Sequence, residues 1–222
     1  DGSYQTTTAF TDSSTIAAGS WSMHAATVNT TNGLQMSGGS FDPWAISTSV
    51  YSQDFSVHVQ SNEPCGVFFK PDGTKMYIAD NNNNDIDQYN LSTAWDISTA
   101  VYSTSGNTSG NIGSAPVDLF FKPDGLKMYV VDDGSNQIYE FNLSTAWDIG
   151  TSAYYSTYNL GSYETSPEGV FFKSDGTKMY VIGKSGDDVN EYNLSTAWDV
   201  STASYSQNKS ISGQEANPSG LF

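Results

Sequence analysis

Residues 66–77 read Gly-Val-Phe-Phe-Lys-Pro-Asp-Gly-Thr-Lys-Met-Tyr, and this stretch decides the fold because it recurs. Close copies occupy residues 118–129 and 169–180. Each copy is followed at a constant distance by Asn-Leu-Ser-Thr-Ala-Trp-Asp. Motifs that recur in this way predict stacked or radially arranged units, each too small to bury its own apolar face alone.

The repeated tryptophan gives the period of the array. It occurs at Trp44, Trp95, Trp147 and Trp198, so that the spacings are 51, 52 and 51 residues. We expect these side chains to be wedges between units, because a buried aromatic contributes much packing energy. On this period the chain divides into an N-terminal strand or tether (1–24), a degenerate first repeat (25–63), three full repeats (64–115, 116–166 and 167–217) and the start of a further repeat (218–222).

The second full repeat shows how one unit becomes a sheet. Its segments 117–122, 127–131, 137–143 and 153–157 are rich in β-branched and aromatic residues, which predicts four short strands. The first turn, Lys122-Pro-Asp-Gly125, has proline at the second position of a type I turn and glycine where a positive φ is needed. Four antiparallel strands per unit are typical of a β-propeller blade. We therefore expect an all-β, propeller-like array, as a partial propeller, with a linear solenoid as the alternative.

The repeat also resembles known families. Phe-Lys-Pro-Asp-Gly-Thr-Lys-Met-Tyr, followed by a polar loop and then Ile/Val-x-x-Tyr-x-Leu, resembles the bacterial and archaeal propeller repeats of the YVTN and NHL type. The fuller pattern with Leu-Ser-Thr-Ala-Trp-Asp resembles repeats of large surface proteins and phage tail-associated proteins from marine environments. The resemblance covers 64–222 and departs from the YVTN type in its longer period and its Ala-Trp connector. It implies propeller blades in an extracellular, cell-surface or virion setting and no particular ligand.

Charge and composition narrow the choice of partners. The net charge is -16, arginine is absent, and six of the eight lysines flank the repeated Asp-Gly turn. Nothing remains for a basic groove, so we expect no nucleic-acid partner. The apolar runs are far shorter than the roughly 20 residues of a membrane span, so we expect no membrane insertion. The strongly acidic, Asn/Ser/Thr-rich surface is consistent with an extracellular location.

The reactive side chains are few. The chain has two histidines, His24 and His58, and neither lies in a recognisable nucleophile context. With the single Cys65 they do not supply a zinc site. Cys65 comes directly before a predicted strand, where we expect a small buried hydrophobe. The sequence therefore predicts a protein that is not an enzyme.

Aspartates are the plentiful chemical groups, and they gather in the loops between the second and third strands of the repeats. The candidate ligand-binding residues are Asp80 and Asp85 (with Asp87), Asp132 and Asp133, and Asp187 and Asp188. Carboxylates of this density could hold Ca²⁺, which takes six to eight oxygen ligands. The three loops differ in sequence and none matches an EF-hand, so solvated turn residues are the simpler interpretation. We therefore expect no cofactor or metal. Ca²⁺ is the one ion for which these loops are a candidate site.

These observations favour a non-enzymatic extracellular or virion-surface module for structure or adhesion. It would present variable loops on a repeat scaffold and bind a glycan or a surface protein through many weak contacts. One alternative is a self-assembling filament or lattice subunit joined by strand completion, since an unpaired sheet edge invites another chain. A polysaccharide-acting enzyme, with its paired carboxylates drawn from the same loops, is the less favoured alternative.

Overall fold

The structure, a computed structural model, describes residues 28–29, 33–34, 49–106 and 112–221. The chain divides into two units, Asp1–Tyr51 and Ser52–Phe222. In the first unit, β1 (Val28–Asn29) pairs antiparallel with β2 (Gly33–Leu34). His24, Trp44 and most of the predicted repeat at 25–63 lie outside the described residues.

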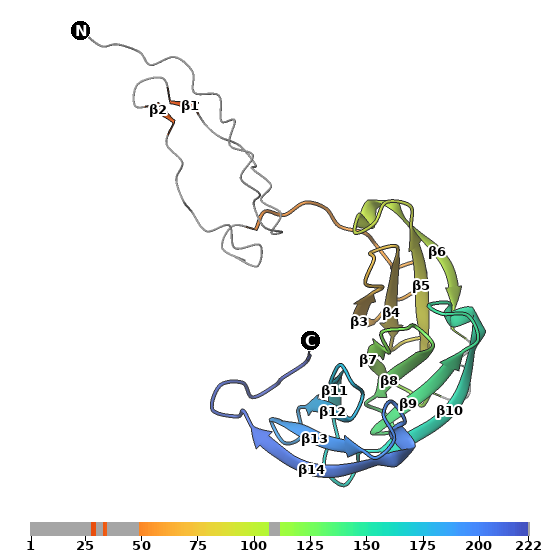
Figure 1. Ribbon diagram of the computed structural model, residues 1–222, viewed down its shortest axis with the longest axis vertical. Helices are drawn as coiled ribbons and strands as arrows, with labels where there is room; N and C mark the ends of the chain where they lie inside the picture. The colour runs from red at the N-terminus through yellow and green to blue at the C-terminus, as the bar shows by residue number, and fades with distance from the viewer. Residues whose placement is uncertain (1–27, 30–32, 35–48, 107–111, 222) are drawn as a thin grey trace, which may run out of the picture. The chain divides into compact units, whose positions relative to one another are not determined.

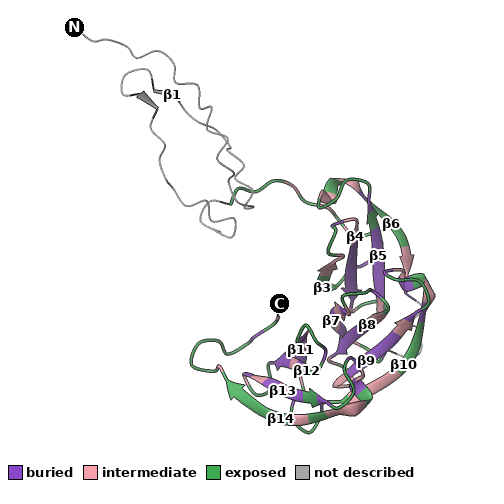
Figure 2. Cartoon of the chain, viewed as in Figure 1, coloured by how far each residue is buried: buried purple, intermediate pink, exposed green. Residues whose placement is uncertain are grey.

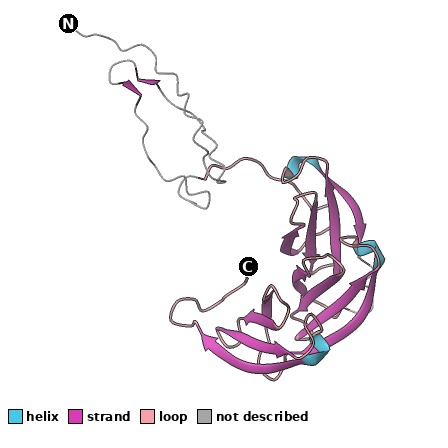
Figure 3. Cartoon of the chain, viewed as in Figure 1, coloured by secondary structure: helices cyan, strands magenta, loops and turns pink. Residues whose placement is uncertain are grey.

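The second unit contains three blades, each a sheet of four antiparallel strands in sequence order (Figure 3). Blade 1 is β3 (Pro64–Phe69), β4 (Lys75–Asp80), β5 (Asp85–Leu91) and β6 (Ala100–Ser105). Blade 2 is β7 (Pro116–Phe121), β8 (Lys127–Asp132), β9 (Gln137–Leu143) and β10 (Ser152–Asn159). Blade 3 is β11 (Pro167–Phe172), β12 (Lys178–Gly183), β13 (Asp188–Leu194) and β14 (Ala203–Ser210).

The blades follow one another around a common inner edge. β3, β7 and β11 lie on that edge, where β7 contacts both β3 and β11, whereas β6, β10 and β14 lie on the outer side (Figure 1). A single turn of 3₁₀ helix precedes each outer strand: η2 (Ile97–Thr99), η3 (Ile149–Thr151) and η4 (Val200–Thr202). The predicted all-β, propeller-like array of four-stranded blades is confirmed. The strands of blade 2 begin and end within two residues of their predicted bounds.

The repeated turn and the repeated tryptophan form one local structure. Gly125 has a φ of +74°, as the turn predicted, and its N–H donates to Lys122 O at 2.8 Å. The Trp147 ring lies against it so closely that a Cβ on Gly125 would be 2.3 Å from Trp147 Nε1. The backbone of Trp147 itself has a φ of +63°, a rare conformation for a bulky residue, and its N–H donates to Gly125 O at 2.9 Å. The contact between Gly125 and the Trp147 ring therefore accounts for both the repeated glycine and the repeated tryptophan.

Two hydrophobic clusters of the described residues lie between successive blades, and a third lies in blade 1 with Phe55 and Val57 packed against it. Trp147 of blade 2 stacks on Phe68 of blade 1, and its carbonyl accepts a hydrogen bond from Tyr77 Oη of blade 1 at 2.8 Å. Tyr129 of blade 2 donates in the same way to the carbonyl of Trp198 in blade 3, also at 2.8 Å. Buried residues concentrate on the two middle strands of each blade, such as β4 and β5 in blade 1 and β8 and β9 in blade 2 (Figure 2). Trp147 and Trp198 are thus wedges between neighbouring blades, as predicted, whereas the prediction is wrong for Trp95, which is exposed.

Side chains of the third strand bind the 3₁₀ helix of the following blade. Gln88 Oε1 accepts from Ile149 N at 3.1 Å, and Glu140 Oε2 accepts from Val200 N at 2.9 Å. Glu140 is fully buried and also pairs with Lys127. These bonds fix the register between successive blades. Among the described residues, no helix is long and apolar enough to cross a membrane.

Candidate functional site

A cavity of about 500 Å³ lies at the inner edge of the blades, where the innermost strands begin. It is lined by 65–67 of β3, Val117 and Asp118 of β7, Glu168 of β11 and residues 219–221. The last of these segments lies against β11, because a Cβ on Gly169 would be 3.1 Å from Leu221 N. The cavity thus receives residues from each successive repeat, which is where a propeller can gather different side chains at one place.

Asp118 is the most unusual residue of this cavity. Its Oδ2 accepts a hydrogen bond from Val170 N of the next blade at 3.0 Å. Burial raises the pKa of Asp118 to about 6, although hydrogen bonds from the Val170 and Leu119 backbones oppose the shift. Gly66 makes room for it, since a Cβ there would lie 2.9 Å from Asp118 Oδ1. A carboxylate with such a pKa is suited to accept a proton near neutral pH.

Two other reactive groups line the cavity. Glu168 forms an ion pair with Lys184 at 2.6 Å, and its side chain is mostly buried. Cys65, predicted to be buried, is exposed, because it lies near the start of an innermost strand with no further strand beyond it. Partial burial raises the pKa of the Cys65 thiol, and the charges of Glu168 and Glu63 add to the rise. The thiol therefore stays protonated at neutral pH and is a poor nucleophile.

This cavity was not predicted from the sequence, because the repeated residues of the innermost strands indicate only scaffold. The Phe-Phe pair of these strands is repeated, but the two positions that line the cavity vary between blades. The second residue of the strand is Cys65, Val117 or Glu168, and the third is Gly66, Asp118 or Gly169. Variation inside an otherwise constant repeat was the available signal.

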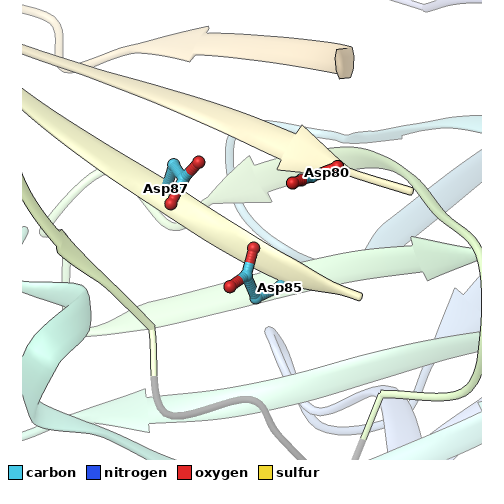
Figure 4. A group of neighbouring side chains, drawn as sticks. All are labelled: Asp80, Asp85 and Asp87. Carbon is cyan, nitrogen blue, oxygen red and sulfur yellow. The ribbon is translucent and has the colours of Figure 1, made fainter. Parts of the chain in front are cut away.

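The predicted loop aspartates come together in blade 1. Asp80 ends β4, Asp85 begins β5, and Asp87 lies two residues further on the same face of that strand. One carboxylate oxygen of each lies within 4.8 Å of the others, and the three carboxylates face a shared space (Figure 4). Among the described residues this is the one group of three carboxylates so arranged.

The corresponding residues of blade 2 form a closed turn instead. Asp132 Oδ1 accepts from both the N–H and the hydroxyl of Ser135 at 2.7 Å. Its Oδ2 accepts from Ala115 N at 3.2 Å. Asp133 follows in the turn, and its backbone N–H also donates to the Ala115 carbonyl. The Asp132 carboxylate is thus occupied by hydrogen bonds that hold the turn.

Blade 3 likewise binds its aspartate with neutral donors. The amides of Asn190 and Asn208 both donate to the buried carboxylate of Asp188, the first at 2.6 Å. Asp187 lies in the preceding turn with a φ of +47°, where Asn84 and Asn136 stand in the other blades. The six predicted aspartates therefore do not form equivalent sites.

His58 lies in a turn and is exposed. The alternating segment 55–59 does not form a strand, because the backbone turns, with N–H groups of Gln60 and Ser61 donating to Val57 O at 2.9 Å. No described residue of the inner cavity or of the blade 1 cluster is a histidine. Any chemistry of these two sites rests on carboxylates.

No protein-family model and no curated protein sequence matches the chain. Solved structures do match it. A provisionally assigned 6-phosphogluconolactonase from Bacteroides uniformis is 17% identical over 66% of this chain and 40% of its own, with a TM-score of 0.51. A second protein with that provisional assignment, from Bacteroides fragilis, is 12% identical over 67% and 39%, with a TM-score of 0.50.

A protein from Lactobacillus plantarum is 16% identical over 66% of this chain and 41% of its own, with a TM-score of 0.52. The chain thus spans about two fifths of the length of these proteins. At such identities the likeness shows the fold alone. It supports the propeller-repeat nature of the chain.

These matches correct the functional prediction. The repeats led us to expect a non-enzymatic module for structure or adhesion, with a self-assembling subunit as an alternative. Solved structures that share the fold include proteins assigned to lactone hydrolysis, and this finding contradicts the prediction. The prediction was wrong because a motif copied into every blade describes the scaffold. It says nothing about the cavity that the scaffold forms from the residues that vary.

Proposed function

We propose that these blades form part of a hydrolase that opens an uncharged sugar lactone in the inner cavity, with Asp118 as the general base. The observation that carries the proposal is Asp118 itself. It stands where blades 1 and 3 have glycine, it lines the cavity, and its pKa of about 6 leaves it ionised and basic at neutral pH. The assignment of two proteins of the same fold as lactonases supports the reaction class.

The reaction requires one proton acceptor and a water molecule. The Asp118 carboxylate accepts a proton from water as the water oxygen attacks the carbonyl carbon of the lactone. The bond from that carbon to the ring oxygen then breaks, and the ring oxygen takes the proton held by Asp118 to become a hydroxyl group, which restores the Asp118 carboxylate. The product is an open-chain hydroxy acid. The closed ring and the attacking water must both lie beside Asp118, which the cavity volume allows.

The charge of the cavity selects the substrate. Asp118 and Glu168 make the cavity acidic, and the nearby Lys184 is already paired with Glu168. The chain has no arginine, the residue best suited to bind phosphate. A phosphorylated lactone would therefore be repelled, and a neutral lactone is favoured. The anionic product would be repelled for the same reason, which assists its release.

The setting of the enzyme is part of the same proposal. The strongly acidic surface supports an extracellular or cell-surface location. The repeat signature supports a relationship to propeller repeats of the YVTN and NHL type. Sugar lactones are small enough for the cavity, so no large partner is needed for this activity.

The experiment is a lactonase assay on the 222-residue chain with glucono-δ-lactone. We expect Asp118→Asn to lower kcat/KM about 100-fold or more, the usual contribution of a general base. Asp175→Asn is the matched control, because Asp175 is an exposed turn residue far from the reaction, and its kcat/KM should stay within a factor of two. Absence of hydrolysis by the unaltered chain, or full activity of Asp118→Asn, would contradict the proposal.

A further inference from the structure

The second unusual place in the molecule is the blade 1 cluster, defined as Asp80, Asp85 and Asp87. Asp80 is fully buried and Asp87 is 3% exposed, while Asp85 is half-buried. Asp85 and Asp87 share one face of β5, and Asp80 pairs with Asp85 across β4 and β5. Backbone pairing therefore brings the three carboxylates together, whatever their charges.

Each of these carboxylates has an oxygen without a partner. Asp80 Oδ2, Asp85 Oδ1 and Asp87 Oδ2 are buried and accept no hydrogen bond from the described residues. Asp80 uses only its Oδ1, which accepts from Asn82 N at 2.9 Å. Buried carboxylates are normally paired, hydrogen-bonded or bound to a metal. Unpaired oxygens that converge on one space point to a missing positive group.

The lysines of the chain do not supply that charge. Six of the eight form ion pairs with other carboxylates, namely Lys70, Lys122, Lys127, Lys173, Lys178 and Lys184. Lys75 donates to the Trp147 carbonyl at 2.9 Å. Lys209, the eighth, pairs through its backbone with Val189 in blade 3. No ion pair among the described residues includes a member of the blade 1 cluster, so no described lysine neutralises these carboxylates.

The other blades show that the fold does not require this arrangement. At the positions of Asp80, Asp85 and Asp87, blade 2 has Asp132, Gln137 and Tyr139, and blade 3 has Gly183, Asp188 and Asn190. Blade 2 places the single carboxylate of Asp132 here, and both of its oxygens accept hydrogen bonds. Blade 3 places the amide-bonded Asp188 here, with Glu164 in the space beside Gly183; Glu164 Oε2 is buried and has no partner among the described residues. Three carboxylates in blade 1 are therefore a departure from the scaffold.

We infer that the blade 1 cluster binds a divalent cation, and that the ion is Ca²⁺. Carboxylate oxygens are the ligands that Ca²⁺ takes at 2.3–2.6 Å. Ligand oxygens within 4.8 Å of one another fit around a single ion of this size. Mg²⁺ requires a smaller and near-ideal octahedral shell, which three carboxylates from two strands supply less well. This site is separate from the proposed lactonase reaction and is tested by binding alone.

The experiment is a calorimetric titration of the chelator-treated, 222-residue chain with CaCl₂. We expect saturable binding with a Kd of about 10⁻⁴ M, in the range of extracellular calcium modules. Asp87→Asn and Asp85→Asn should each weaken binding at least 10-fold, because each removes one anionic ligand. Asp187→Asn is the matched control: it places in blade 3 the asparagine that blades 1 and 2 already have at that position, and it should leave the Kd within a factor of two.

Three results would overturn the inference. The first is no saturable heat from the unaltered chain at about 10 mM Ca²⁺, well above the expected Kd. The second is unchanged binding by Asp87→Asn and Asp85→Asn, both shown to be folded by circular dichroism, since the ion would then be held elsewhere. The third is binding of MgCl₂ as tight as that of CaCl₂, which would contradict the choice of ion.

Discussion

Blades 1 and 3 have the same arrangement of strands but differ in the polar side chains at the turn between their second and third strands. In blade 3, Asp188 is surrounded by amide donors, and Glu164 fills the space that Gly183 leaves, since a Cβ on Gly183 would lie 2.2 Å from its Cδ. In blade 1 the same space holds three carboxylates with unpaired oxygens. One scaffold thus accepts either an aspartate bonded by amide donors or a cluster of three aspartates with unpaired oxygens. Positions where blades agree build the fold, and positions where they differ carry chemistry.

The largest effect is expected where the blades agree in sequence but differ in burial. Trp147 is 9% exposed between blades 1 and 2, whereas Trp95, at the same repeat position, is 59% exposed. Trp147→Ala should lower the free energy of unfolding by about 3–5 kcal/mol, the cost of removing a large buried aromatic. Trp95→Ala should cost less than about 1 kcal/mol. Urea unfolding measures both, and equal losses would contradict the role of Trp147 as a wedge between blades.

The next effect concerns Asp118, the position where blade 2 departs from its neighbours. Because its pKa is raised to about 6 and the base is the ionised form, lactonase kcat/KM should fall about tenfold per pH unit below pH 6. Above pH 7 it should be constant. A pH profile from 4.5 to 8.5 measures this, and a flat profile through pH 6 would exclude Asp118 as the base.

Ionisation of Asp118 should lower the stability of the fold, whereas it raises the activity. Its folded-state pKa is higher than the value of 3.8 for a free side chain, so the folded state prefers the protonated form. The stabilisation is complete below pH 4 and is lost as the pH rises through 6. Asp118→Asn should therefore be inactive but at least as stable as the unaltered chain at pH 8. A variant that is inactive because it is unfolded would show a lower unfolding midpoint.

A smaller effect on stability is expected from exchanging Asp and Asn at the equivalent positions 87 of blade 1 and 190 of blade 3. Asn190→Asp in blade 3 replaces a donor to Asp188 with a second carboxylate, and should destabilise the fold by about 1–3 kcal/mol. Asp87→Asn in blade 1 makes the reverse change, and should stabilise the chain by about 1 kcal/mol when a chelator is present. Urea unfolding with chelator at pH 8 compares the two. Changes of the same sign in the free energy of unfolding of the two variants would contradict this comparison of blades 1 and 3.

The sequence was sufficient for the scaffold because each part of it is local. The turn Lys122-Pro-Asp-Gly125 and the four strands of blade 2 follow from residues next to one another in the chain. The two sites depend on residues that are distant in sequence. Asp118 bonds to a residue 52 positions away, and Asp188 is bound by Asn208, 20 positions away. The sequence showed loops of similar acidity, and only the positions of such donors distinguish a bonded aspartate from an unpaired one.

The most direct test of this account is anomalous scattering from a crystal of the chain grown with Ca²⁺. We expect one ion in blade 1, at 2.3–2.6 Å from an oxygen of each of Asp80, Asp85 and Asp87. No ion is expected beside Asp132 or Asp188, whose oxygens are already hydrogen-bonded. A fully occupied ion at either of those aspartates, or none in blade 1, would contradict the claim that chemistry resides where the blades differ.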